Sequence, residues 1–361
     1  MLYHLLVRLV EVDTFFNVFR YLTFRAAYAT VTALLLSFLI GPWIIRKMRE
    51  LKAGQMIREE GPERHRAKAG TPTMGGLIIL AATVVPTLLW ADLRNPYIHL
   101  LLLATIWMGV LGFLDDYLKV VKRKSEGLIG RQKLVGQILL GILLGVLLHV
   151  RPIHGEFVTQ TSVPFLKNVF LDLGWFYVPF IVLVLVGSSN AVNLTDGLDG
   201  LAIGLAGIAG FAFAGFAYVA GRADWSSYLQ ILYLPGAGEM TIYCMSLVGA
   251  ALGFLWFNTH PAEIFMGDTG SLAMGGAFGT LAILLKAEFL LVIIGGVFVM
   301  EAASVILQVA SFRLRKKRIF RMSPIHHHFE LIGWDEQKIV VRFYILGILF
   351  ALLALSTLKI R

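Results

Sequence analysis

Charged residues are scarce in this chain of 361 residues, because Asp, Glu, Lys and Arg make up only 15% of it, against about 25% in soluble proteins. Hydrophobic residues make up 57%, and the mean hydropathy is +0.75. A soluble fold of this length could not bury so much apolar side chain and keep a polar surface. The composition excludes secreted, nuclear and soluble nucleic-acid-binding proteins, and it indicates a protein whose solvent is a lipid bilayer.

Cysteine is almost absent as well. The single cysteine, Cys244, cannot form an intramolecular disulfide, and its apolar surroundings predict an inert thiol that faces lipid or a neighbouring helix. A cleavable signal peptide is not evident. The first 13 residues mix charges with apolar side chains, which predicts a short helix at the membrane interface.

Long apolar runs are what the sequence does have. A membrane-spanning helix needs about 20 mostly apolar residues. The runs predict an all-α, polytopic membrane bundle of about ten transmembrane helices, with residues 1–361 forming a single integral membrane domain. The ten segments are about 22–45, 74–91, 97–114, 134–150, 174–188, 199–219, 240–257, 271–286, 288–311 and 339–358.

Glycine pairs spaced four residues apart recur in these runs. Such spacing lets helix backbones approach closely in lipid, so we expect the pairs to mark helix contacts. The pairs are Gly141/Gly145, Gly200/Gly204, Gly249/Gly253 and Gly275/Gly279.

The distribution of charge orients the predicted spans. The net charge is +9, and 21 of the 32 Lys and Arg residues fall in five loops on one side of the bundle. The positive-inside rule makes these loops cytoplasmic and places both termini on the outer, periplasmic side. Two of the five loops contain neither Lys nor Arg, yet they hold acidic residues: Asp196, Asp199, Glu263 and Asp268.

Two adjacent carboxylates, Asp115 and Asp116, end one predicted span in the run GFLDDYLKV. Neighbouring helical residues point about 100° apart, so one carboxylate could orient a cation while the other handles a proton. Acidic residues at a helix C-terminus oppose the helix dipole, which favours a functional role over a charged helix end that marks the interface. Lys119 and Lys133 are placed to offset this charge or to hold phosphate oxygens.

The run NAVNLTDGLDGLA repeats Asn or Asp at every third position. On a helix these four side chains would line one stripe, although the glycines of the run disfavour a fully regular helix. The alternative is a capped turn between two short helices, but a cap requires one such residue rather than four. The four residues are Asn190, Asn193, Asp196 and Asp199.

Asp268 precedes another predicted span and lies between Gly267 and Gly270. The glycines permit a close backbone approach, and the helix start presents free N–H groups to an anion. By itself Asp268 could be a helix cap. Together with the other carboxylates it predicts a site where Mg²⁺ bridges phosphates, because hard oxygen ligands beside basic loops suit this ion.

Three consecutive histidines, His326, His327 and His328, follow a basic stretch in what we expect to be a loop, since Pro324 breaks helices. Zinc binding is disfavoured, because sequential histidines do not readily form a tetrahedral set and no cysteine assists. Imidazoles that bind phosphate or orient a sugar fit better.

Two further segments could contribute to a site. The run KAGTPTMGG places Lys68 and Thr73 at a junction between loop and helix, where they could contact substrate. Glu301 lies in the middle of a predicted span. An intramembrane carboxylate is a functional candidate, and a hydrogen bond to a neighbouring helix is an equal alternative for Glu301.

These motifs together resemble the polyprenyl-phosphate N-acetylhexosamine-1-phosphate transferases, and within them the phospho-N-acetylmuramoyl-pentapeptide transferase family. The resemblance covers essentially the whole chain. The acidic motifs are shared by the wider superfamily, whereas PIHHHFE points to the muramoyl-pentapeptide branch. The segments are GTPTMGG at 70–76, GFLDDYLKV at 112–120, NAVNLTDGLDGLA at 190–202, GFLWFNTHPAEIFMGDTGS at 253–271 and SPIHHHFE at 323–330.

The resemblance implies a usually dimeric enzyme of the bacterial cytoplasmic (inner) membrane, with its active site on the cytoplasmic face. It implies transfer of phospho-MurNAc-pentapeptide from UDP-MurNAc-pentapeptide to undecaprenyl phosphate, giving lipid I and UMP with Mg²⁺. Asp268 is implied to be the principal Mg²⁺ ligand, with Asp115 and Asp116 beside it and one of them a candidate base. Phe265 is implied to stack on uracil, and the three histidines to lie near the diphosphate and sugar-peptide. The rest of the implied nucleotide-side pocket is Lys68, Asn190, Asn193, Asp196, Asp199 and Asn258.

In phosphoryl transfer, the protein contributes mainly by positioning the substrates and neutralising their charge. We expect direct attack of the acceptor phosphate on the β-phosphorus, and a covalent aspartyl-phosphate-type intermediate is the alternative. A UbiA-like prenyltransferase would instead release pyrophosphate. A transporter or channel would place charges near the bilayer midplane in paired repeats. A transferase that uses UDP-GlcNAc is the third rival, and PIHHHFE disfavours it.

Overall fold

The computed structural model describes residues 1–51, 70–120, 122, 127–166 and 169–359. Its α-helices are α1 Leu2–Arg8, α2 Leu22–Glu50, α3 Gly76–Trp90, α4 Pro96–Val120, α5 Gly130–Val150, α6 Tyr177–Thr195, α7 Leu201–Ala220, α8 Ala223–Leu229, α9 Met240–Asn258, α10 Gly267–Leu284, α11 Glu288–Ile294, α12 Gly296–Arg315, α13 Ile325–Ile332 and α14 Glu336–Ser356. Short 3-10 helices are Leu9–Glu11, Thr14–Arg20, Gly155–Phe157, Gly174–Phe176 and Ala237–Glu239. The antiparallel strands β1 Gln160–Ser162 and β2 Phe170–Asp172 pair Thr161 with Leu171.

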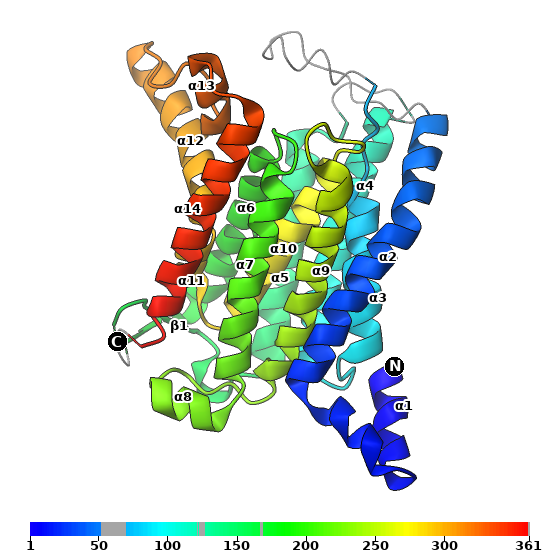
Figure 1. Ribbon diagram of the computed structural model, residues 1–361. Helices are drawn as coiled ribbons and strands as arrows, with labels where there is room; N and C mark the ends of the chain where they lie inside the picture. Colours follow the sequence, from blue (N-terminus) through cyan, green and yellow to red (C-terminus); the bar gives the residue numbers. More distant parts are fainter. Residues whose placement is uncertain (52–69, 121, 123–126, 167–168, 360–361) are drawn as a thin grey trace.

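The chain is an all-α, polytopic membrane protein (Figure 1). Within the described residues, eight helices are long and apolar enough to cross a bilayer. Nine of the ten predicted segments each coincide with one helix, with ends that differ by up to seven residues. The number of crossings and the periplasmic position of the termini stay predictions.

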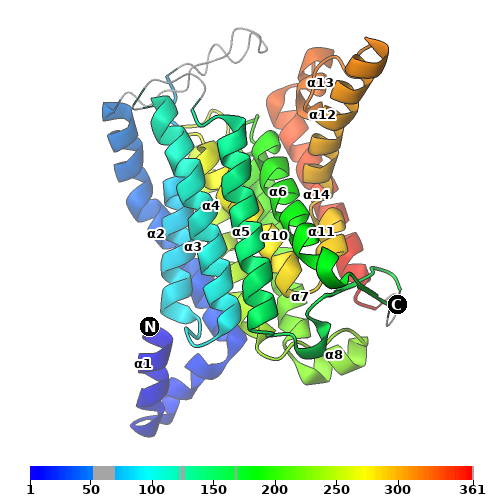
Figure 2. The ribbon, with the colours of Figure 1, turned by 180° about the vertical axis from the view of Figure 1, so that it is seen from behind.

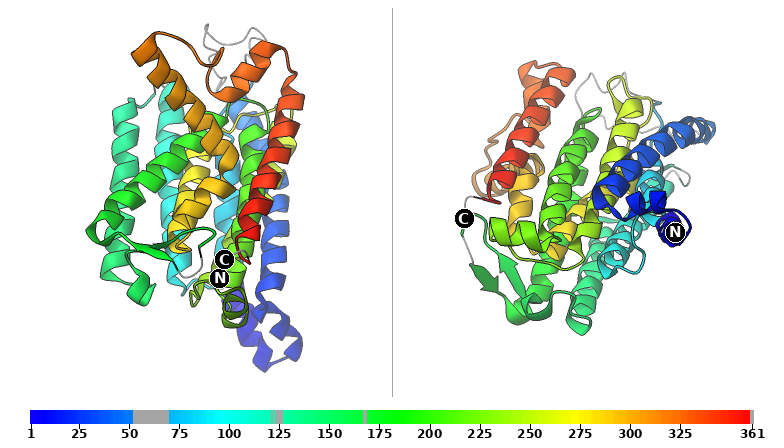
Figure 3. Two further views of the ribbon diagram at one scale, coloured as in Figure 1. Left: turned by 90° about the vertical axis from the view of Figure 1, so that its left-hand side faces the viewer. Right: turned by 60° about the horizontal axis from the view of Figure 1, so that its bottom comes forward.

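One predicted span, 288–311, is broken, which corrects the expectation of a single helix there. Gly295 ends α11, its N–H donates to the carbonyl of Leu291, and α12 begins at Gly296. Two successive glycines weaken a helix interior, and a kink at such a pair is expected physically. The two helices accordingly run in different directions (Figure 3).

Helix α10 lies at the centre of the bundle. It packs against α3, α4 and α6, and its residues from Thr269 to Leu284 are all buried. Figure 1 shows it behind α7 and α9, and Figure 2 shows it behind α4 and α5. Its Gly- and Ala-rich sequence permits this close surrounding, because small side chains let neighbouring helix backbones approach.

The predicted glycine contacts are present at the pair Gly249 and Gly253. Both lie on α9 where it packs against α2, and a Cβ atom on either would overlap Thr30 or Ser37 of α2. Cys244 lies on the same helix and is fully buried, so its thiol faces neighbouring helices rather than lipid.

Both Met1 and the last described residue lie toward one end of the bundle, together with α1 and α8 (Figures 1 and 3). The helix predicted within residues 1–13 is present there as α1. The opposite end gathers the last turns of α4, α6 and α9 and the first turns of α5, α7 and α10. The acidic motifs, far apart in sequence, therefore meet at a single end.

Backbone contacts fix the segment that leads into α10. The N–H groups of Gly75 and Gly76, at the start of α3, donate to the carbonyls of Phe265 and Met266, both at 2.8 Å. A Cβ atom on Gly76 would overlap the backbone of Gly270. The first turn of α10 thus rests directly on the start of α3.

Gly112 on α4 makes a comparable contact, since a Cβ atom there would overlap the carbonyl group of Asp268. We expect Gly112→Ala to force α4 and α10 apart. Overpacking of this kind costs about 1–3 kcal/mol, so the Tm in detergent micelles should fall by several degrees. In the control Gly207→Ala, the new methyl group would lie 3.5 Å from the Cβ of Ala251 and should be tolerated. Equal Tm values for the two variants would contradict the argument.

Candidate functional site

Three carboxylates from two helices meet at the loop-bearing end of the bundle. Asp115 and Asp116 lie in the last turns of α4, and Asp268 lies in the first turn of α10. One oxygen of each lies within 4.8 Å of the others. Asp115 and Asp116 are buried, whereas the Asp268 side chain keeps 15% of its surface exposed. Asp268 is therefore the member of this carboxylate cluster that a ligand reaches most easily.

Asp116 holds the start of α10. Its carboxylate accepts hydrogen bonds from the backbone N–H groups of Asp268 (3.1 Å) and Thr269 (2.8 Å) and from the Thr269 hydroxyl (2.6 Å). The positive end of the helix dipole and its unpaired N–H groups favour a carboxylate there. The anion that the sequence predicted at this helix start is thus Asp116 itself. Asp268 does not cap α10, because the N-cap position belongs to Met266.

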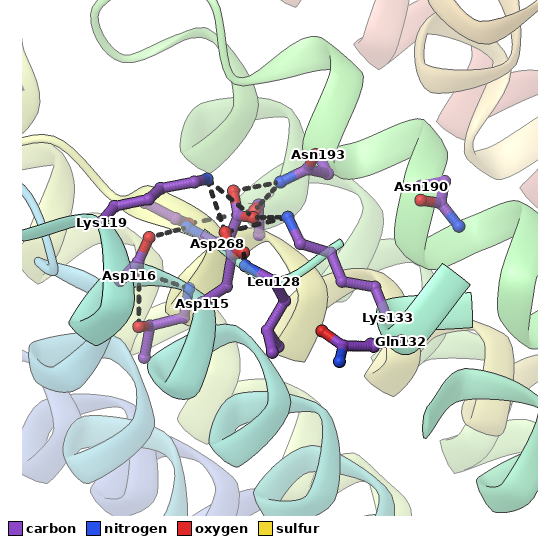
Figure 4. A network of polar contacts seen from close by, with 12 residues as sticks. Asp115, Asp116, Lys119, Leu128, Gln132, Lys133, Asn190, Asn193 and Asp268 are labelled. Atoms are coloured by element: carbon purple, nitrogen blue, oxygen red, sulfur yellow. Dashed lines mark hydrogen bonds and ion pairs between the residues drawn. The ribbon is translucent and has the colours of Figure 1, made fainter. Parts of the chain in front are cut away.

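Asp115 faces a different set of partners. Its Oδ2 lies 2.5 Å from Nζ of Lys119 and 2.9 Å from Nζ of Lys133, and its Oδ1 accepts a hydrogen bond from the backbone of Leu128. The same two ammonium groups lie 3.4 and 2.5 Å from Oδ2 of Asp268. Figure 4 shows them reaching Asp268 from opposite sides. Neighbouring carboxylates on α4 therefore have separate partners, as their angular separation predicts.

The two asparagines of α6 lie in different surroundings. Asn193 donates to Oδ1 of Asp268 at 2.9 Å and to the hydroxyl of Ser271 at 2.8 Å. Asn190 donates instead to Gln137 on α5, at 3.0 Å, and lies apart from the carboxylates in Figure 4. Asn193 thus orients the Asp268 carboxylate, whereas Asn190 joins α6 to α5.

The predicted stripe from Asn190 to Asp199 is wrong beyond Thr195, where α6 ends. Asp196 follows in a turn, and Gly200 adopts a positive φ of 80° before α7 begins. Glycine tolerates this left-handed conformation, which breaks the helical spacing. Asp196 and Asp199 consequently lie in a loop between two helices.

Asp199 belongs to a second polar group rather than to the carboxylate cluster. Its Oδ2 lies 2.9 Å from Nδ1 of His260 and accepts a hydrogen bond from the backbone of Ala262. Glu336, in the first turn of α14, lies 3.5 Å from the same histidine nitrogen and accepts a hydrogen bond from the Asp199 backbone. This group joins the start of α7, the loop after α9 and α14.

Asn258, at the end of α9, is buried and uses both ends of its amide. Its Nδ2 donates to the carbonyl of Ile264 at 2.9 Å, and its Oδ1 accepts from the N–H of Gly200 at 3.0 Å. It therefore fixes the loop before α10 against the start of α7. In that loop, the backbone N–H of Phe265 donates a hydrogen bond to the carbonyl of Pro72, and the Phe265 side chain is partly exposed.

Thr73 lies beside the carboxylate cluster, since a Cβ atom on Gly267 would lie 2.9 Å from its hydroxyl oxygen and 2.6 Å from Oδ2 of Asp116. Gly267 itself has a positive φ of 71°. Lys68, the other predicted contact in that segment, lies outside the described residues.

The three histidines lie on helix α13, which corrects the expectation of a loop. Pro324 immediately precedes the helix, a place where its missing N–H costs nothing. His326 is buried, with Nδ1 3.1 Å from Oε2 of Glu301. His327 lies 2.7 Å from Glu330, and Nδ1 of His328 accepts a hydrogen bond from the backbone ahead of the helix.

Known proteins match this sequence along its whole length. The family model of glycosyl transferase family 4 matches residues 98–286, and the phospho-N-acetylmuramoyl-pentapeptide-transferase signature 1 matches residues 68–80. Proteins named phospho-N-acetylmuramoyl-pentapeptide-transferase from Geobacter sp. (strain M21) and Citrifermentans bemidjiense are each 58% identical over 361 residues, which is 100% of both chains. The chain belongs to the phospho-N-acetylmuramoyl-pentapeptide transferase family. The protein of that name from Koribacter versatilis is 54% identical, again over the full length of both chains.

An apolar groove of about 360 Å³ opens in the helix bundle of this transferase-family chain. It runs between α6, α10, α11 and α12, and its lining includes Ala191, two residues before Asn193. The lining residues Leu183, Val292 and Ile306 are more than half exposed, so the groove opens on the outer, apolar surface of the bundle.

Sequence reasoning missed several residues of this site. Ser271 accepts a hydrogen bond from Asn193, and Thr269 donates to Asp116 of the carboxylate cluster. His260 and Glu336 surround Asp199. The first three lie within the segment at 253–271 and could have been found by treating every polar residue of that motif as a candidate. Glu336 carries no comparable signal, because only the packing of α14 brings it near.

Asp196 is partly buried between α6 and α7. Burial and the nearby carboxylates of Asp268 and Asp116 raise the pKa of Asp196 to about 8. In the unfolded chain this group titrates near pH 4. Between these values the folded chain holds a proton that the unfolded chain has released, so stability falls as the pH rises.

We therefore expect Asp196→Asn to stabilise the chain increasingly between pH 5 and pH 8, when chelator keeps cations absent. The Tm difference from the unchanged chain should grow by a few degrees across this range. Asp224→Asn is the control, since a hydrogen bond from Arg222 lowers the pKa of Asp224 and keeps it ionised throughout. A difference for Asp196→Asn that stays constant with pH would contradict the prediction.

Proposed function

We propose that this chain transfers phospho-MurNAc-pentapeptide from UDP-MurNAc-pentapeptide to undecaprenyl phosphate, giving lipid I and UMP in the first membrane step of peptidoglycan synthesis. The observation that carries the proposal is the carboxylate cluster with its two lysines at one end of a membrane bundle. Relatives that match the full chain bear the name of this transferase.

Mg²⁺ is the metal we propose for the carboxylate cluster. The donor set supports it, because three carboxylates close together offer hard oxygen ligands and no sulfur. Asp268 would be the principal ligand, since its side chain is the most exposed of the three. When bound, Mg²⁺ would supply positive charge that neutralises the diphosphate and the charge that develops on the UMP leaving group.

The chain's own residues would position the diphosphate and the attacking phosphate. Lys119 and Lys133 lie where their ammonium groups could contact phosphate oxygens as well as carboxylates. Asp116 is committed to the start of α10 and so keeps Asp268 in place. Asp115 is the carboxylate of the pair that faces the lysines, and we assign it the proton of the acceptor phosphate.

Direct attack is the route we favour. An acceptor phosphate oxygen would form the new bond to the β-phosphorus as the bond to UMP breaks, with no bond to the protein. A labelled sugar-phosphate trapped on the protein without lipid acceptor would contradict this route.

The apolar groove suits the lipid acceptor. A polyprenyl chain would lie in it from the bilayer side, while its phosphate reached the carboxylate cluster beyond Ala191. We propose the cytoplasmic face of the bacterial inner membrane for this end, and the excess of Lys and Arg in its loops supports the proposal. We propose a homodimer as the working form, as the family resemblance implies.

Purified protein in micelles should release UMP from UDP-MurNAc-pentapeptide only when undecaprenyl phosphate and Mg²⁺ are both present, and chelation should stop the release. Asp268→Asn should lower kcat by at least about 100-fold, because charge stabilisation in the transition state is lost. The exposed variant Asp224→Asn should retain full activity. No UMP from the unchanged chain, or pyrophosphate in its place, would overturn the proposed function.

Filling the groove tests the route of the lipid. Ala303→Phe places a ring among the lining residues of α12, and it should raise KM for undecaprenyl phosphate about tenfold while leaving KM for the UDP substrate unchanged. Ile348→Phe, on the exposed apolar face of α14, is the matched control. An unchanged KM for the lipid in Ala303→Phe would place the acceptor elsewhere.

A further inference from the structure

Glu301 is a buried carboxylate for which the proposed transfer has no use. It lies on α12 between apolar neighbours and is 0% exposed. Its Oε2 lies 3.1 Å from Nδ1 of His326 and 3.5 Å from the backbone nitrogen of the same residue. Within the described part of the chain, Oε1 of Glu301 and both ring nitrogens of His326 have no hydrogen-bond partner, so the two side chains meet as a close polar pair. A carboxylate in a membrane-spanning helix is costly, which favours a specific task for Glu301.

The other side of His326 faces the loop that joins α6 to α7. A Cβ atom on Gly197 would overlap Nε2 of His326, so only glycine leaves room for the ring. Gly197 directly follows Asp196 and lies two residues before Asp199. The imidazole is thus held between Glu301 on α12 and the loop that carries these two carboxylates.

We propose that Glu301 is a positioning residue, which orients His326 and through it holds the loop of Asp196 and Asp199 in the shape that binds the nucleotide. The inference rests on the proposed function. The Glu301 carboxylate, 3.1 Å from Nδ1, places a negative charge beside one edge of the ring and so favours a single orientation of the imidazole.

The position of Glu301 on α12 relates the nucleotide-side loop to the apolar groove. Ala302 and Ala303, the next two residues, line the apolar groove. The same turn of helix therefore contacts the groove with one face and the nucleotide-side loop, through His326, with the other. The contact between Glu301 and His326 therefore fixes the position of the Asp196–Asp199 loop relative to α12, the helix along which we expect the lipid to lie.

Steady-state kinetics with Glu301→Gln tests the inference. The amide removes the negative charge beside Nδ1 and so releases the orientation of the ring; KM for UDP-MurNAc-pentapeptide should rise roughly tenfold, with KM for undecaprenyl phosphate unchanged. His326→Gln should give a similar rise, and the double variant should be no worse than His326→Gln alone, because both changes break one contact. Independent, multiplying effects would overturn the proposal.

A matched control separates positioning from loss of stability. Glu239 is another paired carboxylate, partly buried and 2.7 Å from Arg25 at the opposite end of the bundle. Glu239→Gln should lower the Tm and leave both KM values unchanged. If Glu301→Gln behaves in the same way, Glu301 is only structural and the proposal is wrong.

Gly197→Ala tests the contact of His326 with the loop from the other side. It keeps the inference testable if Glu301→Gln does not fold. Its methyl group should displace the ring of His326 and produce the same rise in KM for the UDP substrate. Calorimetric titration with UMP measures the nucleotide pocket without turnover, and it should show the same loss of affinity. If the wild-type protein is active and Gly197→Ala has the same KM and the same affinity for UMP, the inference alone is refuted. If the wild-type protein binds UMP but is inactive, the proposed function is refuted.

Discussion

The contact between the Asp116 carboxylate and the first turn of α10 is the interaction on which the rest of the site depends. It joins the end of one buried helix to the start of another and satisfies N–H groups that the surrounding apolar helices could not. Because Asp268 lies in that same turn, the contact places its carboxylate opposite Asp115. Lys119 and Lys133 each contact oxygens of both Asp115 and Asp268, so the carboxylates and the two ammonium groups form a compact group of opposite charges.

Backbone packing supports this contact. Gly112 and Gly76 bring α4 and α3 directly against the first turn of α10, and the start of α3 pairs with the segment before it. On the other side, Asn193 holds the free oxygen of Asp268. The groove along α12 and the loop that contacts His326 lie outside this closely packed centre. The lipid substrate would reach the groove from the bilayer, and the UDP substrate would reach the loop from water.

Much of this arrangement could be predicted from the sequence. The apolar runs located the helices, and the acidic motifs at one predicted face do meet in space. The different partners of Asp115 and Asp116 follow from helix geometry alone. The role of Asp116 as a cap could not be predicted, because it depends on a helix about 150 residues away. The glycines at 197 and 200 correctly disfavoured a regular helix there, since α6 ends at Thr195. Two other local expectations were wrong: Gly295 breaks the span predicted at 288–311, and Pro324 begins a helix instead of preventing one.

The backbone contact of α3, α4 and α10 has a consequence for the protein's relation to its membrane. Helices adjust to bilayers of different thickness by tilting, at a cost of fractions of a kcal/mol for each ångström of mismatch. Here three helices are joined at one end by main-chain atoms that cannot slide past one another. They must tilt as one body, so the distances among the three carboxylates are insulated from the lipid composition around them.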